Sequence, residues 1–234
     1  TMLIDKFSDL FRLKVIERLN RFTVLLVDNN GTKYLGLLRN TGKLKDLIYP
    51  DAVLVCKKWS RPKTNCLIIG AETKYGIALI DTYTQMRVFE KLANLRYISW
   101  LKDYEILKKE VTIDDSRLDY MIGSKDTIGY MELKSAVFMN NDTAMYPDTP
   151  SERGIRHINL LKSIREMGYR SIISFIAAHP TAKQFRPYWE VDPKIREGLI
   201  NAKLKGVEIY AVKYYLDLDG NLIFETDNLP IILD

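Results

Sequence analysis

SRLDYMIGSKDTIGYMELKSAVF, residues 116–138, is the stretch that decides the fold of the larger part of the chain. Apolar and polar residues alternate on both sides of the sequence GSKD, which indicates two antiparallel strands joined by a four-residue loop. We predict that Ile122 and Thr127 close this hairpin. The charged sequence ELK stands inside the second strand, where apolar residues would be expected, and therefore calls for an explanation.

The expected register places the charged residues of the hairpin on one face. Asp119 is predicted to lie opposite Tyr130. Glu132 is predicted to lie opposite Arg117, with Lys134 two residues further along the strand. Because strand side chains alternate between faces, these five share one face, with the Cβ atoms of Asp119 and Glu132 roughly 7–8 Å apart. The other face takes the apolar residues, which are Leu118, Tyr120, Ile122, Met131 and Leu133.

Two neighbouring carboxylates repel each other and stay ionised together only with a cation between them. Oxygen ligands favour a hard divalent ion, so Asp119 and Glu132 predict a Mg²⁺ or Mn²⁺ site. Such an ion holds a phosphate and acidifies a bound water, and Lys134 would add a positive charge beside both. This combination predicts phosphodiester hydrolysis. The alternative is an ordinary solvated strand face with surface ion pairs.

The first third of the chain has a different pattern, with short β segments separated by turn residues. The predicted strands are Phe11–Glu17, Arg21–Val27, Lys33–Leu38, Ala52–Trp59 and Asn65–Glu72. Five short strands within some sixty residues predict a small closed barrel of the OB type, whose face binds oligonucleotides or oligosaccharides.

Charge separates these two uses of a barrel. Residues 1–80 contain 14 Lys and Arg against 7 Asp and Glu, whereas the rest of the chain contains 21 against 23. A net charge of +7 in the first eighty residues favours a polyanion such as nucleic acid over an oligosaccharide. The oligosaccharide-binding module stays the weaker alternative.

The remainder of the chain predicts a mixed α/β domain. Helices are expected at 81–95, from Thr149 to about Met167 with TPSE as a capping box, and at 193–205. Strands are expected at 107–113, 117–122, 127–138, 171–178 and 207–216. The prediction is thus an α+β protein of two domains: an OB-like barrel at 2–78 and an α/β domain with a mixed central sheet at 79–234.

Several sequence segments together resemble the sugar fermentation stimulation protein A (SfsA) family. They are NRFTVLLV (20–27), RNTGKL (39–44), SRLDYMI (116–122), YMELKSA (130–136) and YPDTPSERGIRH (146–157). Their order and spacing match over nearly the whole chain. The resemblance implies an N-terminal OB-like domain, a C-terminal PD-(D/E)xK nuclease-like domain, nucleic-acid binding and a nuclease acting on DNA, RNA or both.

Carried over to this sequence, the resemblance makes Asp119 a metal-binding aspartate and Glu132 and Lys134 the E-x-K pair. The carbonyl of Leu133 is implied as a further metal ligand. A helix acid often completes such a site, and Glu90 fits, with Glu110 as its rival.

Supporting roles are implied for three residues of the last of these segments, Asp148, Arg153 and His157. Arg153 and His157 are four apart on one predicted helix and share a face. Asp148 is equally consistent with a hydrogen bond within its loop.

The candidates for nucleic-acid contact lie in the barrel: Arg21, Arg39, Lys43, Lys57, Lys58, Trp59, Arg61 and Lys63. The basic side chains would follow phosphates, and Trp59 would stack on a base. Its alternative role is to close the barrel.

The predicted function is that of a two-domain nuclease that depends on Mg²⁺ or Mn²⁺. A non-catalytic, DNA-binding regulator of sugar metabolism that keeps the nuclease fold is the alternative. No apolar run reaches the length of a membrane span and no signal-peptide pattern is present, so we expect a cytoplasmic protein without membrane partners. Homodimer formation is left open. Cys56 and Cys66 are expected to be ordinary thiols in a pair of strands, with a cross-strand disulfide as the alternative.

Overall fold

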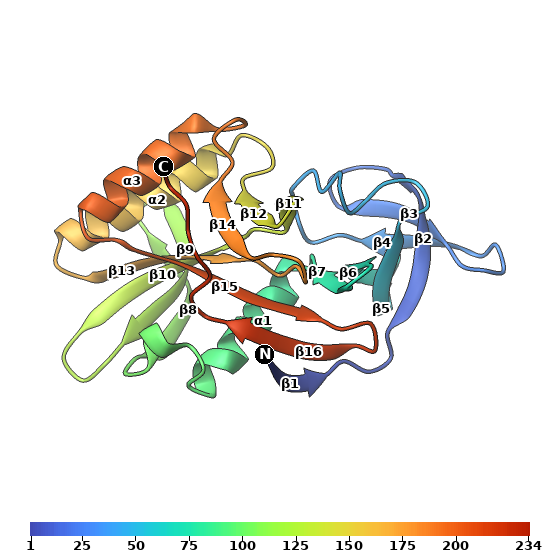
Figure 1. Cartoon of the computed structure of the whole chain (residues 1–234), viewed down its shortest axis with the longest axis horizontal. Coiled ribbons are helices and arrows are strands. Elements are labelled where there is room, and N and C mark those ends of the chain that lie inside the picture. The colour runs from blue at the N-terminus through green and yellow to red at the C-terminus, as the bar shows by residue number, and fades with distance from the viewer.

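Five strands near the N-terminus close into a barrel in the computed structural model, which describes residues 1–234 (Figure 1). They are β2 (Phe11–Arg18), β3 (Thr23–Val27), β4 (Lys33–Leu37), β5 (Val53–Arg61) and β6 (Thr64–Thr73). Antiparallel pairing runs β4–β3–β2–β5–β6, and a parallel pairing of β4 with β6 closes the ring. The predicted OB-like barrel is confirmed, and its five strands lie within two residues of their predicted ends.

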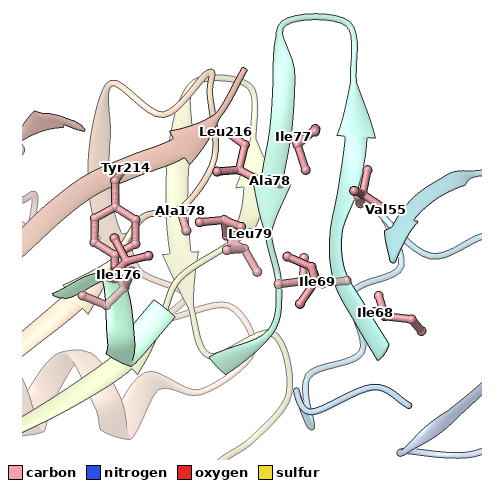
Figure 2. Packing of buried hydrophobic residues seen from close by; sticks show 14 of the residues in the cluster. Val55, Ile68, Ile69, Ile77, Ala78, Leu79, Ile176, Ala178, Tyr214 and Leu216 are labelled. Carbon is pink, nitrogen blue, oxygen red and sulfur yellow. The ribbon is translucent and has the colours of Figure 1, made fainter. Parts of the chain in front are cut away.

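The barrel and the second sheet are continuous. β7 (Gly76–Leu79) pairs with β6 on one side and with β15 (Glu208–Leu216) on the other. Figure 2 shows side chains from β6, β7 and β15 lying together at this junction, within one core cluster of 39 buried residues. β1 (Met2–Lys6) lies outside the barrel, where it pairs with β16 (Asn221–Thr226). The domain boundary after residue 78 stays a prediction.

The second sheet is mixed, as predicted. It continues from β15 through β13 (Arg170–Ile176), β10 (Ile128–Ser135), β9 (Ser116–Gly123) and β8 (Glu105–Ile113). β15, β13 and β10 are parallel to one another, whereas β10, β9 and β8 form an antiparallel meander.

Helices cover both faces of this sheet (Figure 1). α1 (Thr82–Asn94) packs with the core cluster that continues from the barrel, and the short helix η1 (Ser99–Leu101) follows it. α2 (Glu152–Glu166) and α3 (Pro193–Leu204) cover the other face through a separate cluster of 17 buried residues. Alternate residues of β13 supply the two clusters: Ile172 and Ile176 face α1, and Ile173 and Phe175 face α2 and α3.

A separate small sheet of three strands lies beside the barrel loops. It contains β11 (Phe138–Asn140), β12 (Thr143–Tyr146) and β14 (Gln184–Pro187). The sequence analysis missed β1, β7, β12, β14 and β16. It also joined β10 and β11 into one strand, but the chain leaves the main sheet after Ser135.

The hairpin register differs from the predicted one. Gly123 pairs with Ile128, and Tyr120 pairs with Met131, so the partner of each residue lies two positions further along the chain than expected. The turn itself explains the displacement, because the N–H of Ser124 donates to the carbonyl of Thr127 at 2.9 Å and residues 124–127 form the loop. The pairings of Asp119 with Tyr130 and of Glu132 with Arg117 were therefore wrong. Continuing the observed register places Asp119 directly opposite Glu132.

The start of α2 also differs from its prediction. The sequence TPSE was expected to place Thr149 at the cap, but the cap is Ser151, whose hydroxyl accepts from the N–H of Gly154 at 3.0 Å. Ser151 supplies its own acceptor two residues later than expected, and Pro150 stays outside the helix.

Both cysteines are free and fully buried in the barrel. None of the helices has the length and apolar character needed to cross a membrane.

Candidate active site

Asp119 and Glu132 are joined across the β9–β10 hairpin by a reciprocal pair of hydrogen bonds. The N–H of Asp119 donates to Oε2 of Glu132 at 3.0 Å, and Oδ2 of Asp119 accepts from the N–H of Leu133 at 2.7 Å. Carboxylates thus take the place of ladder acceptors, and the backbone pairing of the two strands ends at Tyr120 and Met131. Backbone donors fix both carboxylates without using a flexible side chain.

The side-chain alternation of β9 breaks at the same point. Tyr120 and Ile122 belong to the cluster under α1, as predicted. Leu118 has the same parity but packs in the cluster under α2 and α3. The prediction that Leu118 shares the face of Tyr120 was therefore wrong; the alternation breaks where the carboxylate of Glu132, and not a backbone carbonyl, accepts from the N–H of Asp119.

Lys134 and His157 complete a compact cluster around Glu132. Nζ of Lys134 lies 2.9 Å from Oε1 of Glu132 and 2.9 Å from Nδ1 of His157. Nδ1 of His157 lies 2.7 Å from the same oxygen. Glu132 and His157 are each only 2% exposed. The structure thus brings Asp119, Glu132, Lys134 and His157 together at one place between the sheet and α2.

Burial and mutual repulsion set the charges of the two carboxyl groups. Burial, followed by the charge of Glu132, raises the pKa of Asp119 to about 7. Burial also raises the pKa of Glu132, but Lys134 and His157 outweigh it and lower that pKa to about 2. Near neutral pH Glu132 is therefore ionised, and Asp119 gains or loses a proton according to what lies beside it.

The donor set suits a hard divalent cation. Oδ1 of Asp119 makes no hydrogen bond, and Oε2 of Glu132, which accepts only the N–H of Asp119, keeps unused acceptor capacity. Asp119 is also partly exposed. No cluster of three or more His, Cys, Asp or Glu side chains forms a complete set of metal ligands. A cation here would therefore take two carboxylates and fill its remaining positions from other oxygens, as Mg²⁺ usually does.

Two family models match successive parts of the chain: an SfsA N-terminal OB domain matches residues 16–84, and a sugar fermentation stimulation protein RE domain matches residues 83–220. A sugar fermentation stimulation protein homolog from Pyrococcus furiosus is 37% identical, over 95% of this chain and 96% of the relative. The chain belongs to the sugar fermentation stimulation protein (SfsA) family. Another SfsA homolog, from Archaeoglobus fulgidus, is 34% identical over 94% of each chain.

A solved structure supports the fold of this SfsA-family chain. Pyrococcus furiosus SfsA, solved in complex with Ca²⁺, superposes with a TM-score of 0.94 at 36% identity. The match covers 99% of this chain and 100% of the solved one. The arrangement of barrel, sheet and helices is therefore the arrangement of the family.

The helix acid expected in this SfsA site lies in a neighbouring set of contacts. Oε1 of Glu90 accepts from the hydroxyl of Tyr120 at 2.9 Å, and Oε2 accepts from Nζ of Lys109 at 2.5 Å. Tyr120 is next to Asp119 in sequence but packs on the α1 face. The rival, Glu110, is exposed and lies 3.8 Å from Arg117. The structure does not bring either acid into hydrogen-bond contact with Asp119 or Glu132, and their roles stay predictions.

The other supporting residues separate as well. Oδ2 of Asp148 accepts from the N–H of Leu44 at 2.8 Å and so holds a barrel loop against the second domain. Arg153 is exposed near the start of α2 and has no ion-pair partner. Leu133 is tied to the site through its N–H, and the role of its carbonyl stays a prediction.

Most of the basic residues predicted to contact nucleic acid have no acidic partner. Among the basic members, only Arg39 has a carboxylate within 4 Å, that of Asp81. Arg21 and Lys43 meet at Arg18, whose guanidinium donates to both of their carbonyl oxygens. The remaining basic members, on β5 and its turn, are Lys57, Lys58, Arg61 and Lys63. Trp59 packs at the border of the core, which fits its alternative role as well.

A polar connection between barrel and site was missed by the sequence analysis. The hydroxyl of Ser135, the residue after Lys134, accepts from the amide of Gln85 at 2.9 Å and lies 3.4 Å from the amide of Asn40. Both amides also donate to backbone carbonyls around β7, those of Leu79 and Ile80. In the sequence, Asn40 and Gln85 appear only as isolated polar residues beside apolar runs. Their shared partner Ser135 lies 95 and 50 positions away, so no local pattern could have predicted the contacts.

Proposed function

We propose that this SfsA-family protein is a metal-dependent nuclease that hydrolyses phosphodiester bonds of DNA, RNA or both. The observation that carries the proposal is the reciprocal carboxylate pair of Asp119 and Glu132 with the ammonium of Lys134 beside it. Two carboxylates held side by side in a buried site cost free energy of folding. Such costly arrangements cluster at functional sites, which is why this pair supports the proposal.

Each residue has a distinct part in this proposal. Asp119 and Glu132 would hold Mg²⁺ or Mn²⁺, with the carbonyl of Leu133 as a further ligand. The bound ion supplies Lewis-acid activation of water and neutralisation of charge on the phosphate. Lys134 orients the attacking water and stabilises negative charge that develops on the phosphate oxygens. His157 positions Lys134 and Glu132, because its Nδ1 contacts both.

Two further findings support the proposal. The Pyrococcus furiosus relative was solved in complex with Ca²⁺, a hard cation that takes oxygen ligands as Mg²⁺ does. The barrel adds a surface rich in unpaired Lys and Arg on a fold that commonly binds oligonucleotides. In this account the barrel holds the nucleic acid and the second domain cuts it.

The direct test is a cleavage assay on four end-labelled substrates: single-stranded and duplex DNA, and single-stranded and duplex RNA. With Mg²⁺ or Mn²⁺ the wild-type protein is expected to cut at least one, and Lys134→Ala is expected to cut it at least a hundredfold more slowly. Lys162→Ala, at a half-buried position of α2 with no ion-pair partner, is the matched control and should cut as the wild type does. The proposal fails if all four substrates stay intact, or if Lys134→Ala cuts as well as the wild type.

A second candidate function is favoured by the charge balance around Glu132. Lys134 and His157 already satisfy that carboxylate without a cation, so the cluster is also stable as a structural unit. A DNA-binding regulator of sugar metabolism that no longer cuts would keep such a unit. It predicts salt-sensitive binding that survives both EDTA and Lys134→Ala, with no cleavage under any metal condition.

A further inference from the structure

A chain of alternating aromatic and guanidinium groups connects the barrel to α1. The guanidinium carbon of Arg39 lies 4.5 Å from the ring centre of Tyr83 and 5.5 Å from that of Trp59. The guanidinium of Arg61 lies 5.3 Å from the ring centre of Trp59. We call these four side chains, Tyr83, Arg39, Trp59 and Arg61, the cation–aromatic chain.

The middle of this chain is rigid. Nε and Nη2 of Arg39 donate to the two carboxylate oxygens of Asp81 at 2.7 and 2.6 Å, and Asp81 is fully buried at the cap of α1. The carbonyl of Arg39 accepts from the hydroxyl of Thr82 at 2.7 Å. The indole N–H of Trp59 has no hydrogen-bond acceptor, so the ring is held by packing and by the two guanidinium groups. Such a preorganised surface binds without ordering flexible side chains first.

The two ends of the chain are open. Tyr83 lies in the first turn of α1, and its side chain is 58% exposed instead of packing into the core. Arg61 is exposed and has no ion-pair partner. Exposed rings beside guanidinium planes are the surfaces on which unpaired bases stack, since every base has a π face, whereas the bases of a duplex are already stacked on each other.

The cation–aromatic chain is also connected to the candidate active site through neighbouring residues. Asn40 follows Arg39, and its amide approaches the hydroxyl of Ser135, which follows Lys134 on β10. Gln85, on the first turns of α1 after Tyr83, donates to the same hydroxyl. A nucleic acid bound to the cation–aromatic chain would therefore lie next to α1 and to the segment after Arg39, both of which contact β10 directly after Lys134.

We infer that the cation–aromatic chain binds single-stranded nucleic acid by base stacking, with Tyr83 as its exposed stacking residue. This inference rests on the proposed function for nucleic-acid binding and narrows it to unpaired strands. The cation–aromatic chain is expected to bind without sequence preference, because stacking and guanidinium contacts tolerate any base.

The test compares Tyr83→Leu, Tyr83→Phe and the wild type in EDTA, where no cleavage occurs. Binding to a fluorescent single-stranded oligonucleotide and to its duplex is measured by anisotropy. Stacking is measured separately by quenching of 2-aminopurine placed in the single strand. Tyr75→Leu is the matched control, because Tyr75 is 64% exposed and also contacts one cation, Lys74, but belongs to no such chain.

Tyr83→Leu is expected to weaken single-strand binding about tenfold or more and to abolish the quenching. Tyr83→Phe and Tyr75→Leu should stay within about twofold of the wild type. Equal loss for single strand and duplex, or no loss for the single strand, would overturn the inference and leave the proposed function standing. Wild-type protein that binds neither form would overturn both. Unchanged thermal unfolding of Tyr83→Leu, expected at so exposed a position, assigns any loss to the missing ring.

Discussion

The N–H of Asp119 donates to the carboxylate of Glu132, while the carboxylate of Asp119 accepts from the N–H of the residue that follows Glu132. Each strand therefore positions the acid of the other. This arrangement holds two carboxyl groups close together in a buried place, where their repulsion is reflected in the raised pKa of Asp119. We therefore expect the folded protein to be less stable with this site empty than with a cation bound between the two carboxylates.

The first prediction concerns stability without metal. The pKa of Asp119 is about 7 in the folded protein, against an ordinary value of 3.8, so folding is disfavoured progressively as pH rises from about 4 to about 7. Asp119→Asn removes the ionisation and keeps an oxygen for the N–H of Leu133. We expect this variant to be more stable than the wild type by roughly 1–3 kcal/mol at pH 8 and by less at pH 5. Urea unfolding in EDTA measures the difference. A variant less stable than the wild type at pH 8 would contradict the raised pKa.

The second prediction concerns metal affinity and pH. Below about pH 7 a cation must displace the proton of Asp119, so affinity for Mn²⁺ should rise about tenfold per pH unit up to that point and level off above it. Titration calorimetry in buffers of different ionisation enthalpy would also show release of about one proton at pH 6. His179 does not account for this profile, because burial and the nearby Lys213 lower its pKa to about 4. An affinity that is flat between pH 5.5 and 7 would argue against Asp119 as a ligand.

The third prediction concerns His157, which touches both Glu132 and Lys134. His157→Ala should weaken Mn²⁺ binding about 10- to 100-fold, because partners of metal ligands orient those ligands. His179→Ala is the matched control: His179 is the only other histidine, is also buried, and hydrogen bonds Thr181 instead of the site. Equal losses in the two variants would indicate a general packing defect and not a role for His157 at the site.

The fourth prediction concerns the junction of the domains. Asp81 is fully buried, accepts from the N–H of Thr84 at 3.0 Å and binds Arg39 through both oxygens. Asp81→Ala loses a helix cap and leaves a partly buried guanidinium without its partner, so we expect a loss of about 3 kcal/mol in the free energy of unfolding.

Asp5→Ala provides the comparison for Asp81→Ala, because it removes an exposed ion pair with Lys91 and should change the free energy by less than about 1 kcal/mol. Urea denaturation of both variants gives the two values. Similar small losses would show that Arg39 is not held by Asp81.

Local patterns predicted much of the fold from the sequence. Alternation and turn residues located the five barrel strands, and Asp119 and Lys134 both lie beside Glu132, as expected, although the register was displaced. The displacement kept the parity of the paired residue numbers, so Asp119 lies opposite Glu132 instead of diagonal to it. The hydroxyl and backbone bonds of Ser124 and Thr127, which set the turn, leave no periodic signal in the sequence.

Contacts between distant segments were not predictable in this way. The approach of Asn40 and Gln85 to Ser135 depends on how the barrel docks on the second sheet through β7. Strand β1 was not predicted for the same reason: its partner β16 is more than 200 residues away in the sequence. Alternation reports the faces of a strand and not its distant partners.

The most direct measurement for the central claim is anomalous diffraction from crystals of this protein grown with Mn²⁺. The account predicts a strong anomalous peak between the carboxylates of Asp119 and Glu132, about 2.2 Å from an oxygen of each, and its loss in Asp119→Asn. A peak elsewhere, or none at saturating Mn²⁺ with both carboxylates still bonded only to the backbone, to Lys134 and to His157, would contradict it.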